Sequence, residues 1–268
     1  MKRKWFLWLF YIIVFLSCGT RDKEEPDGRL GSYSQVLLSV SDIQASLNFY
    51  QQLGLQQIDG RTGGPNPWVL LTEGNNSIML SQNDFPSPAL TYYADNMLER
   101  VKYFQKNSIT FSDLSWKDEK LQNAVLHDPN RFGITLIAFD PSRFPSVQDT
   151  TARAGLKLME ISIPTAEMDE SVNFWKKLGF SVVAERDAPN RIVQVSDGMQ
   201  HLAFLQTKSF SEPALTFAAE NPDTVVSRLE KKGLLEGEAH YLNNAVVFKD
   251  PDGILLRFMK TNELPPEN

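Results

Sequence analysis

The sequence predicts an α+β protein in which four βαβββ units form two tandem halves. The main observation is an internal repeat. The segment 42–55, DIQASLNFYQQLGL, returns as DESVNFWKKLGF at 169–180, with the shared Ser, Asn, Phe, Leu and Gly residues 125 positions later. In addition, apolar runs of strand length follow both segments. We therefore expect two domains with the same fold.

Both repeated segments are expected to be helices, because their apolar residues recur at helical spacing. Each segment ends at a glycine, Gly54 or Gly179, which can adopt the left-handed conformation that closes a helix. The apolar residues are Leu47, Tyr50, Leu53, Val172, Trp175 and Leu178.

Short apolar runs separated by turn residues predict the remaining elements. In the first half we expect strands at 36–40, 55–58, 68–72, 77–81, 90–94, 109–114, 124–126 and 134–139, and helices at 43–53 and 97–106. In the second half we expect strands at 158–163, 181–184, 191–195, 201–205, 215–218, 241–248 and 254–259, and helices ending at Gly179 and spanning 224–232.

Further matches between the halves support a duplication. The segment 88–91, PALT, returns at 213–216, and Asp128-Pro129 corresponds to Asp250-Pro251. The second match has a slightly shorter spacing than the first, which loop-length changes explain.

The first residues are typical of a signal for export and are not expected to belong to a folded domain. Lys2, Arg3 and Lys4 precede an apolar run at 5–16 and then Ser17-Cys18, which is the order of a secretory signal. The junction resembles the lipobox of bacterial lipoproteins, which implies that Cys18, the only cysteine, is acylated and becomes the mature N-terminus. An uncleaved anchor or a buried cysteine is the alternative. The resemblance implies a lipid-anchored protein of the cell envelope, facing outside the cytoplasm.

Composition limits the partners. Without the three basic residues of the signal, the net charge falls from −6 to −9. An acidic surface of this kind argues against nucleic acid as a partner. The expected organisation is a signal peptide at 1–17, a lipid-anchored tether at 18–32, a first domain at 33–140, a linker at 141–155, a second domain at 156–260 and a tail at 261–268.

The repeated helix pattern S-x-N-F-[YW]-x-x-L-G, the closing turn Asp-Pro-Asp-Gly at 250–253 and the four βαβββ units together resemble the vicinal oxygen chelate superfamily. This superfamily includes glyoxalase I, extradiol dioxygenases, fosfomycin-modifying transferases and bleomycin-resistance proteins. The resemblance spans 33–260 and implies two glyoxalase-like domains with curled mixed sheets around clefts. For the enzymes of the family it also implies a divalent metal, held by inward His and Glu side chains, that acts as a Lewis acid.

The resemblance places metal ligands in the first strand of each half and four residues after the glycine of its closing turn. In the first half these positions hold Gln35 and, depending on the register of the turn, Ile137 or Thr135. None of these is a good metal ligand. We therefore expect no catalytic metal in the first domain and keep Gln35 as a candidate ligand-binding residue.

In the second half the same positions hold Glu160 and Arg257, and Thr216 stands where a histidine is often found. Arginine stays protonated and cannot bind a metal. We expect Arg257 either to form a salt bridge to Glu160 across the cleft or to face solvent. A third role is to bind a carboxylate or phosphate of a ligand through two hydrogen bonds.

The other candidates are one histidine and one aromatic residue. Strand alternation could place His201 in the cleft beside Glu160, which makes these two residues the candidates for a divalent metal site. His127 and His240 are expected at the surface. Trp175 is a candidate for lining a ligand pocket, with a place in the core as the alternative.

Three functional hypotheses follow. The first is a membrane-anchored glyoxalase-like protein that binds a small organic molecule, an anion if Arg257 takes part, and whose metal site is degenerate. The second is a metal-dependent lyase or dioxygenase that acts through the second domain with Glu160 and His201. The third is an envelope scaffold protein. These residues leave open whether the protein is an enzyme.

Overall fold

The computed structural model describes residues 28–145, 155–235, 239–242 and 245–261. Cys18 and the predicted signal and tether up to residue 27 lie outside this part of the chain. No helix within the described ranges is long and apolar enough to cross a membrane.

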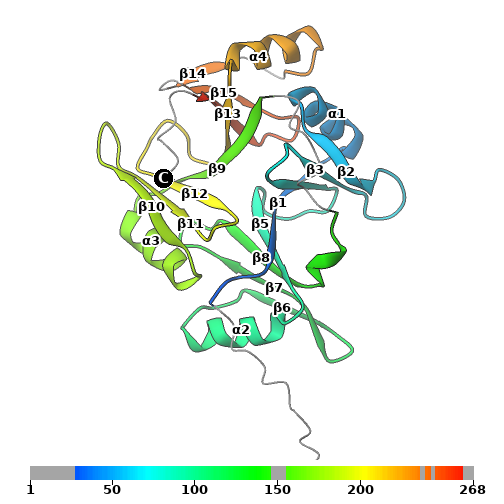
Figure 1. Ribbon diagram of the computed structural model, residues 1–268, viewed down its shortest axis with the longest axis vertical. Coiled ribbons are helices and arrows are strands. Elements are labelled where there is room, and N and C mark those ends of the chain that lie inside the picture. The colour runs from blue at the N-terminus through cyan, green and yellow to red at the C-terminus, as the bar shows by residue number, and fades with distance from the viewer. Residues whose placement is uncertain (1–27, 146–154, 236–238, 243–244, 262–268) are drawn as a thin grey trace, which may run out of the picture.

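Each half of the chain forms its own eight-stranded mixed sheet (Figure 1). The first sheet has the order β2-β3-β4-β1-β5-β8-β7-β6. Its strands are β1 (Tyr33–Ser39), β2 (Gln56–Arg61), β3 (Trp68–Thr72), β4 (Ser77–Ser81), β5 (Ala89–Ala94), β6 (Asp113–Lys117), β7 (Lys120–His127) and β8 (Gly133–Ala138).

The second sheet repeats this topology in the order β10-β11-β12-β9-β13-β16-β15-β14. Its strands are β9 (Leu156–Pro164), β10 (Ser181–Arg186), β11 (Ile192–Ser196), β12 (His201–Leu205), β13 (Ala214–Ala219), β14 (His240–Leu242), β15 (Ala245–Lys249) and β16 (Leu255–Lys260). The predicted α+β class and the four βαβββ units are therefore confirmed.

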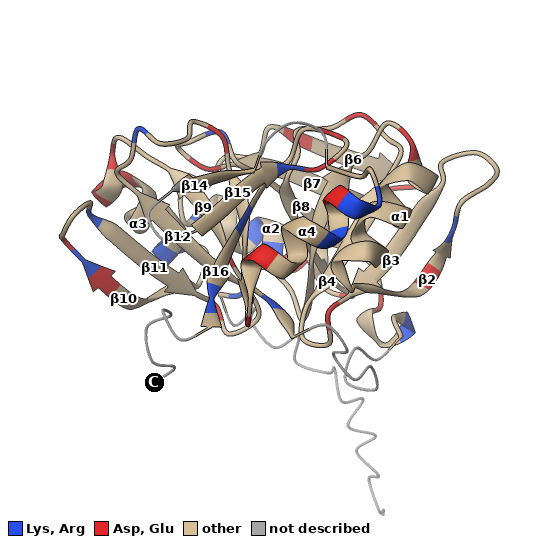
Figure 2. Ribbon diagram, turned by 90° about the horizontal axis from the view of Figure 1, so that it is seen from above, with Lys and Arg blue, Asp and Glu red and all other residues tan. Residues whose placement is uncertain are grey.

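Four helices cover one face of the sheets: α1 (Ile43–Leu53), α2 (Met97–Lys106), α3 (Met168–Lys177) and α4 (Pro222–Lys231). Because side chains alternate along a strand, every second residue faces these helices and builds the core. Phe217 and Phe258, for example, are fully buried and stack at 5.4 Å between ring centroids. We call the opposite face of each sheet its inner face. Charged residues gather mainly on loops and helices, and most strand segments carry none (Figure 2).

Two predicted elements were wrong. The segment 109–114 is mostly not a strand, because Ile109 is a buried loop residue and β6 begins only at Asp113. The predicted strand 241–248 is two antiparallel strands, β14 and β15, paired through Tyr241 and Val246. Both errors arise at the outermost strands, β6 and β14, which stand at the edges of the two sheets.

The repeated helices end as predicted. Asp42 begins α1 by accepting hydrogen bonds from the backbone N–H groups of Gln44 and Ala45. Gly54 ends it with a φ of 113°, and Gly179 follows α3 with a φ of 91°. A Cβ atom at Gly179 would lie only 2.6 Å from the carbonyl oxygen of Gly28, so glycine is needed there for space as well as for conformation.

The two domains are joined by a reciprocal contact between the opening helix of each and the closing turn of the other. The buried Tyr50 of α1 donates a 2.7 Å hydrogen bond to Asp250 of the second domain. In the same way, the buried Trp175 of α3 donates through Nε1 to Asp128 of the first domain at 3.1 Å. Both acceptors start equivalent Asp-Pro turns. The interface therefore contains two equivalent contacts, one from each copy of the internal repeat.

Smaller contacts follow the same pattern. Ser46 donates to Asp252 at 2.5 Å, and Asn130 donates to Ser171 at 2.9 Å. At the β-hairpins, Asn76 donates to the carbonyl oxygen of Leu158 at 3.1 Å, and Tyr92 donates to Asp197 at 2.8 Å. The helices α1 and α4, which belong to different domains, also lie side by side (Figure 1).

Three buried carboxylates at this interface have raised pKa values. Burial raises the pKa of Asp250 from 3.8 to about 6, although hydrogen bonds from Tyr50 and from the backbone of Ile254 and Asp252 lower it. Burial likewise raises the pKa values of Asp128 and Glu73. In each case the folded state holds a proton more strongly than the unfolded chain.

We predict that the free energy of unfolding falls as the pH rises from about 4 to 6. The stabilising contribution of Asp250 is fully present below its unfolded pKa and is lost as the pH rises through its folded value. The two-unit shift corresponds to roughly 3 kcal/mol. Asp250→Asn keeps the acceptor for the turn but cannot titrate, so urea unfolding at a series of pH values should show a shallower slope. If the free energy of unfolding depends on pH as steeply in Asp250→Asn as in the unmodified chain, Asp250 is not the titrating group.

Candidate functional site

The candidate site lies on the inner face of the second sheet, across its three central strands. Glu160 and Ser162 are alternate residues of β9 and therefore share a face. Thr216 of β13 pairs with Glu160, and Arg257 of β16 pairs with Thr216. We call Glu160, Ser162, Thr216 and Arg257 the second-domain site.

A chain of hydrogen bonds connects these side chains. Arg257 donates through Nη1 to the hydroxyl oxygens of Ser162 at 2.8 Å and Thr216 at 3.2 Å. Ser162 donates to Oε1 of Glu160 at 3.1 Å. The other carboxylate oxygen of Glu160 accepts a 2.6 Å hydrogen bond from the amide of Gln194 on β11. Glu160 is therefore held by neutral donors on both of its oxygens.

A salt bridge to Glu160 was one of the roles expected for Arg257, and the contact is indirect instead. Among the described residues, neither makes an ion pair within 4.0 Å, and the hydroxyl of Ser162 lies between them. Burial lowers the pKa of Arg257, and the charge of Glu160 opposes this effect. A guanidinium remains protonated under these conditions. The site thus holds a largely buried cation whose direct partners are two neutral hydroxyl groups.

The remaining hydrogen-bond donors of Arg257 are free within the described structure. Its Nη2 and Nε atoms make no hydrogen bond to any described residue. Its guanidinium carbon lies 5.3 Å from the ring centroid of Phe210, in the loop between β12 and β13. This placement over an aromatic face fixes the orientation of the guanidinium.

The first domain carries neutral residues at the equivalent positions. Gln35 of β1 pairs with Thr91 of β5, and Thr91 pairs with Thr135 of β8. The structure thus selects Thr135 over Ile137 as the counterpart of Arg257. The reason is that Arg131, with a φ of 67°, takes the place of Gly253, with a φ of 84°, in the closing turn. The spacing of the two Asp-Pro pairs already indicated this register.

A divalent metal of the kind the family resemblance implies does not fit these residues. The three matched positions supply a single carboxylate and no imidazole in the second domain, and only an amide and two hydroxyls in the first. Arg257 places a positive charge where a ligand would stand. Within the described ranges, no group of three or more His, Cys, Asp or Glu residues could hold a metal ion.

His201 is exposed at the start of β12. Its neighbour Leu202 pairs with Ile161 in the parallel register, so His201 lies beside Glu160 on the adjacent strand. Residues side by side on adjacent strands share a face, and we call such a line of residues across a sheet a row. No hydrogen bond joins His201 to Glu160 within the described structure. His127 and His240 are also exposed. Trp175 lies far from this row, fully buried on the helix side at the contact with Asp128.

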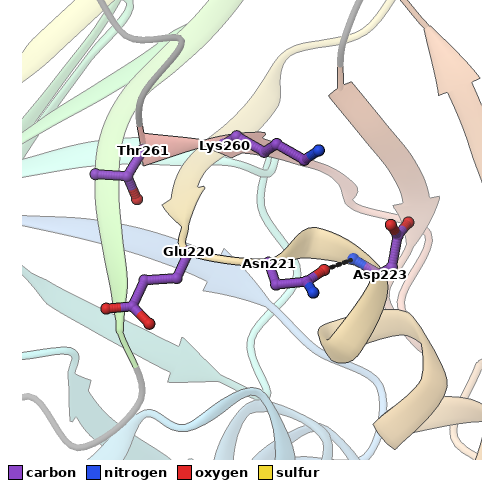
Figure 3. A pocket seen from close by; sticks show the side chains of 5 residues that line it. All are labelled: Glu220, Asn221, Asp223, Lys260 and Thr261. Carbon is purple, nitrogen blue, oxygen red and sulfur yellow. Dashed lines mark hydrogen bonds between the residues drawn. The ribbon is translucent and has the colours of Figure 1, made fainter.

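A separate open hollow of about 450 Å³ lies where β13 and β16 end and α4 begins (Figure 3). It is lined by Glu220, Asn221, Asp223, Lys260 and Thr261. The side chain of Asn221 already accepts the N–H of Asp223 as the cap of α4. With two carboxylates and one lysine, all exposed, the hollow has little to orient a ligand.

Fold and site together define a two-domain protein of paired βαβββ units whose two inner faces carry different residues at equivalent positions. The family model "Glyoxalase/Bleomycin resistance protein/Dioxygenase superfamily" matches residues 32–161 and 157–258. The chain therefore belongs to this superfamily, with two tandem domains, as the sequence predicted. No curated protein sequence matched the chain.

Solved structures of similar fold include extradiol dioxygenases. A catechol 2,3-dioxygenase is 18% identical, with a TM-score of 0.55 and 90% of each chain covered. Homoprotocatechuate 2,3-dioxygenase from Arthrobacter globiformis is 14% identical, with a TM-score of 0.57, 89% of this chain covered and 82% of the other. At these identities the similarity establishes the fold alone.

Sequence reasoning missed three residues of the site. Ser162 could have been found, because it lies two residues after Glu160 on the same strand face. Gln194 and Phe210 could not, because their contacts depend on strand register and on the path of the β12–β13 loop.

We predict that a metal site can be gained by replacing the residues that prevent it. The double change Thr216→His and Arg257→Glu should surround Glu160 with two further donors. Nickel or zinc at a hundred times its dissociation constant should then stabilise the variant by about 2.7 kcal/mol, measured as a thermal shift. Thr216→His with Arg257→Gln, which lacks the second carboxylate, is the matched control. If metal raises the melting temperature of the unmodified chain and Glu160→Ala removes this effect, the conclusion that these residues do not fit a metal is wrong.

Proposed function

We propose that this protein is a small-molecule binding protein whose second domain takes an organic anion, such as a carboxylate, on Arg257. The observation that carries the proposal is the largely buried guanidinium with two nitrogen donors that no described residue uses. Nη1 is anchored by Ser162 and Thr216, while Nε and Nη2 make no hydrogen bond within the described structure. These two nitrogens form one edge of the planar guanidinium, which matches the two oxygens of a carboxylate.

Electrostatics support an anion rather than a neutral ligand. A buried cation is costly unless a counter-charge and hydrogen bonds compensate it. Glu160 supplies part of this compensation at a distance, but Ser162 and Gln194 already occupy its oxygens. An anion on the free edge of Arg257 would complete the compensation.

The alternative of a metal-dependent lyase or dioxygenase receives less support from the same residues. That function needs a set of anionic and imidazole ligands, and the matched positions supply a single carboxylate next to a cation. No feature of the described structure favours the envelope scaffold over the binding function.

The proposal predicts that 4-fluorobenzoate binds the full chain and that binding depends on Arg257. Fluorine NMR titration is the measurement, because it reports weak binding directly. Arg257→Gln should weaken binding by at least tenfold, since a charge-assisted hydrogen bond contributes about 1.5–3 kcal/mol.

Two matched variants sharpen the test. Arg257→Lys keeps the charge but loses the planar edge, so it should bind more weakly than the unmodified chain and more tightly than Arg257→Gln. Glu160→Gln removes a nearby negative charge and should tighten binding. Equal affinity of the unmodified chain and Arg257→Gln would refute the proposal.

We also propose that the protein is exported and held in the cell envelope by acylation of Cys18. The support is the ordered basic, apolar and Ser-Cys sequence of the first residues. Labelling with a palmitate analogue in a bacterial host should mark the unmodified chain and leave Cys18→Ser unlabelled. An unlabelled native chain would exclude the lipid anchor.

A further inference from the structure

The first domain contains an unusual set of unpartnered polar atoms on its inner face. Among described residues, the buried side-chain nitrogen and oxygen atoms that lack a hydrogen bond are Nε2 of Gln35, Oγ1 of Thr91 and Oδ1 of Asn123. Gln35 and Thr91 are both 0% exposed. All three lie on the inner face, because residues that pair across neighbouring strands share a face and form a row across the sheet. Gln35 and Thr91 pair in one row. Asn123 belongs to the next row, in which it pairs with Ile137, and Ile137 pairs with Tyr93.

Such atoms need an explanation. A buried donor or acceptor without a partner loses its hydrogen bonds to water and gains nothing in return. Native proteins keep few such groups, and a partner from outside the chain, such as a water, an ion or a bound molecule, is one explanation for those that remain. Here Gln35 and Thr91 are neighbours in one row that crosses the sheet. A single molecule placed over this row can therefore satisfy both.

The central part of this row is uncharged, and the exposed Asp113 of the edge strand β6 lies two strands further along it, beyond Val125. The inner-face residues of the four central strands of the first sheet are aromatic, apolar or neutral polar. They are Tyr33, Gln35, Leu37, Ser39, Ser77, Met79, Ser81, Ala89, Thr91, Tyr93, Gly133, Thr135 and Ile137. The equivalent row of the second domain holds Glu160 and Arg257. The ligand that fits the first row is therefore neutral.

Aromatic rings cover the neighbouring row, in which Tyr33 pairs with Tyr93. Phe144 stacks on Tyr33 at 4.6 Å between ring centroids with an interplanar angle of 16°, and it meets Tyr93 edge-on at 4.7 Å. Phe139 lies 5.1 Å from Phe144. The hydroxyl of Tyr93 also reaches Oε1 of Gln35 at 3.5 Å, which leaves only Nε2 of Gln35 unpartnered.

Phe144 differs from the other rings in how it is held. It caps a three-residue 3₁₀ helix (Pro141–Arg143) that follows β8, whereas Tyr33 and Tyr93 lie within strands of the sheet. Its ring covers one face of Tyr33. Aromatic stacking of this kind is weak enough for a ligand to replace.

We propose that the inner face of the first domain is a second binding site, specific for an uncharged, ring-bearing molecule with a carbonyl group, such as an aromatic amide. The carbonyl oxygen accepts from Nε2 of Gln35, an adjacent donor or acceptor of the ligand pairs with Oγ1 of Thr91, and the ring replaces Phe144 against Tyr33. Neighbouring strands lie about 4.8 Å apart, so a single amide group can contact both residues.

The test uses 4-fluorobenzamide as the probe, followed by fluorine NMR on the full chain. The unmodified chain should show saturable binding. Gln35→Met and Thr91→Val, which keep size but remove the polar atoms, should each weaken binding about fivefold. Phe144→Ala removes the competing ring and should tighten binding severalfold. Arg257→Gln should leave the affinity for this probe unchanged, which separates this site from the one in the second domain.

Thermal unfolding supplies an independent readout. Thr91→Val is the variant to measure, because Oγ1 of Thr91 makes no hydrogen bond, whereas Gln35→Met would also leave the buried Tyr93 hydroxyl without its acceptor Oε1. If Thr91 is kept for a ligand, Thr91→Val removes an unsatisfied buried group and should raise the melting temperature of the ligand-free chain. If Thr91 has a structural role only, the same change should lower it. The proposal is overturned by absence of saturable binding, by affinity that survives both Gln35→Met and Thr91→Val, by weaker binding in Phe144→Ala, or by a lowered melting temperature of Thr91→Val.

Discussion

The structure depends on two equivalent hydrogen bonds that cross between the domains. Tyr50 and Trp175, at matching positions of the repeated helices, each donate to the first residue of the closing turn in the other domain. The acceptors also shape their own turns: Asp128 accepts from the backbone of Asn130 and Phe132, and Asp250 accepts from Asp252 and Ile254. One carboxylate thus fixes both a turn and an interface.

This arrangement explains why the two inner faces have been free to diverge. Helix packing and domain packing both use the helix side of the sheets, where Trp175 and Tyr50 are fully buried. The inner faces contribute little to helix packing or to domain packing. The same three positions can therefore hold Gln35, Thr91 and Thr135 in one domain and Glu160, Thr216 and Arg257 in the other without a change of fold.

The sequence predicted the framework better than the site. The helices 43–53 and 97–106 and the strands 68–72, 77–81 and 201–205 have the predicted bounds, because their apolar periodicity is strong. Glu160 and Arg257 were found through their places in the repeated pattern. The bridge through Ser162 was missed, because it depends on the register of three strands, two of them distant in sequence. For Trp175 both a pocket and the core were left open, because helical spacing does not tell which partner an apolar face meets, and the structure places it in the core.

The contrast between the two faces bears on what each can bind. In the second domain one cation is buried with neutral direct partners, and its unused edge favours a negative group. In the first domain no charge is present on the central strands, and the unused atoms are one amide nitrogen and one hydroxyl oxygen in the same row. An anion placed there would lose its hydration without gaining a counter-charge, which is costly in a buried site. The two domains are therefore expected to select different ligands.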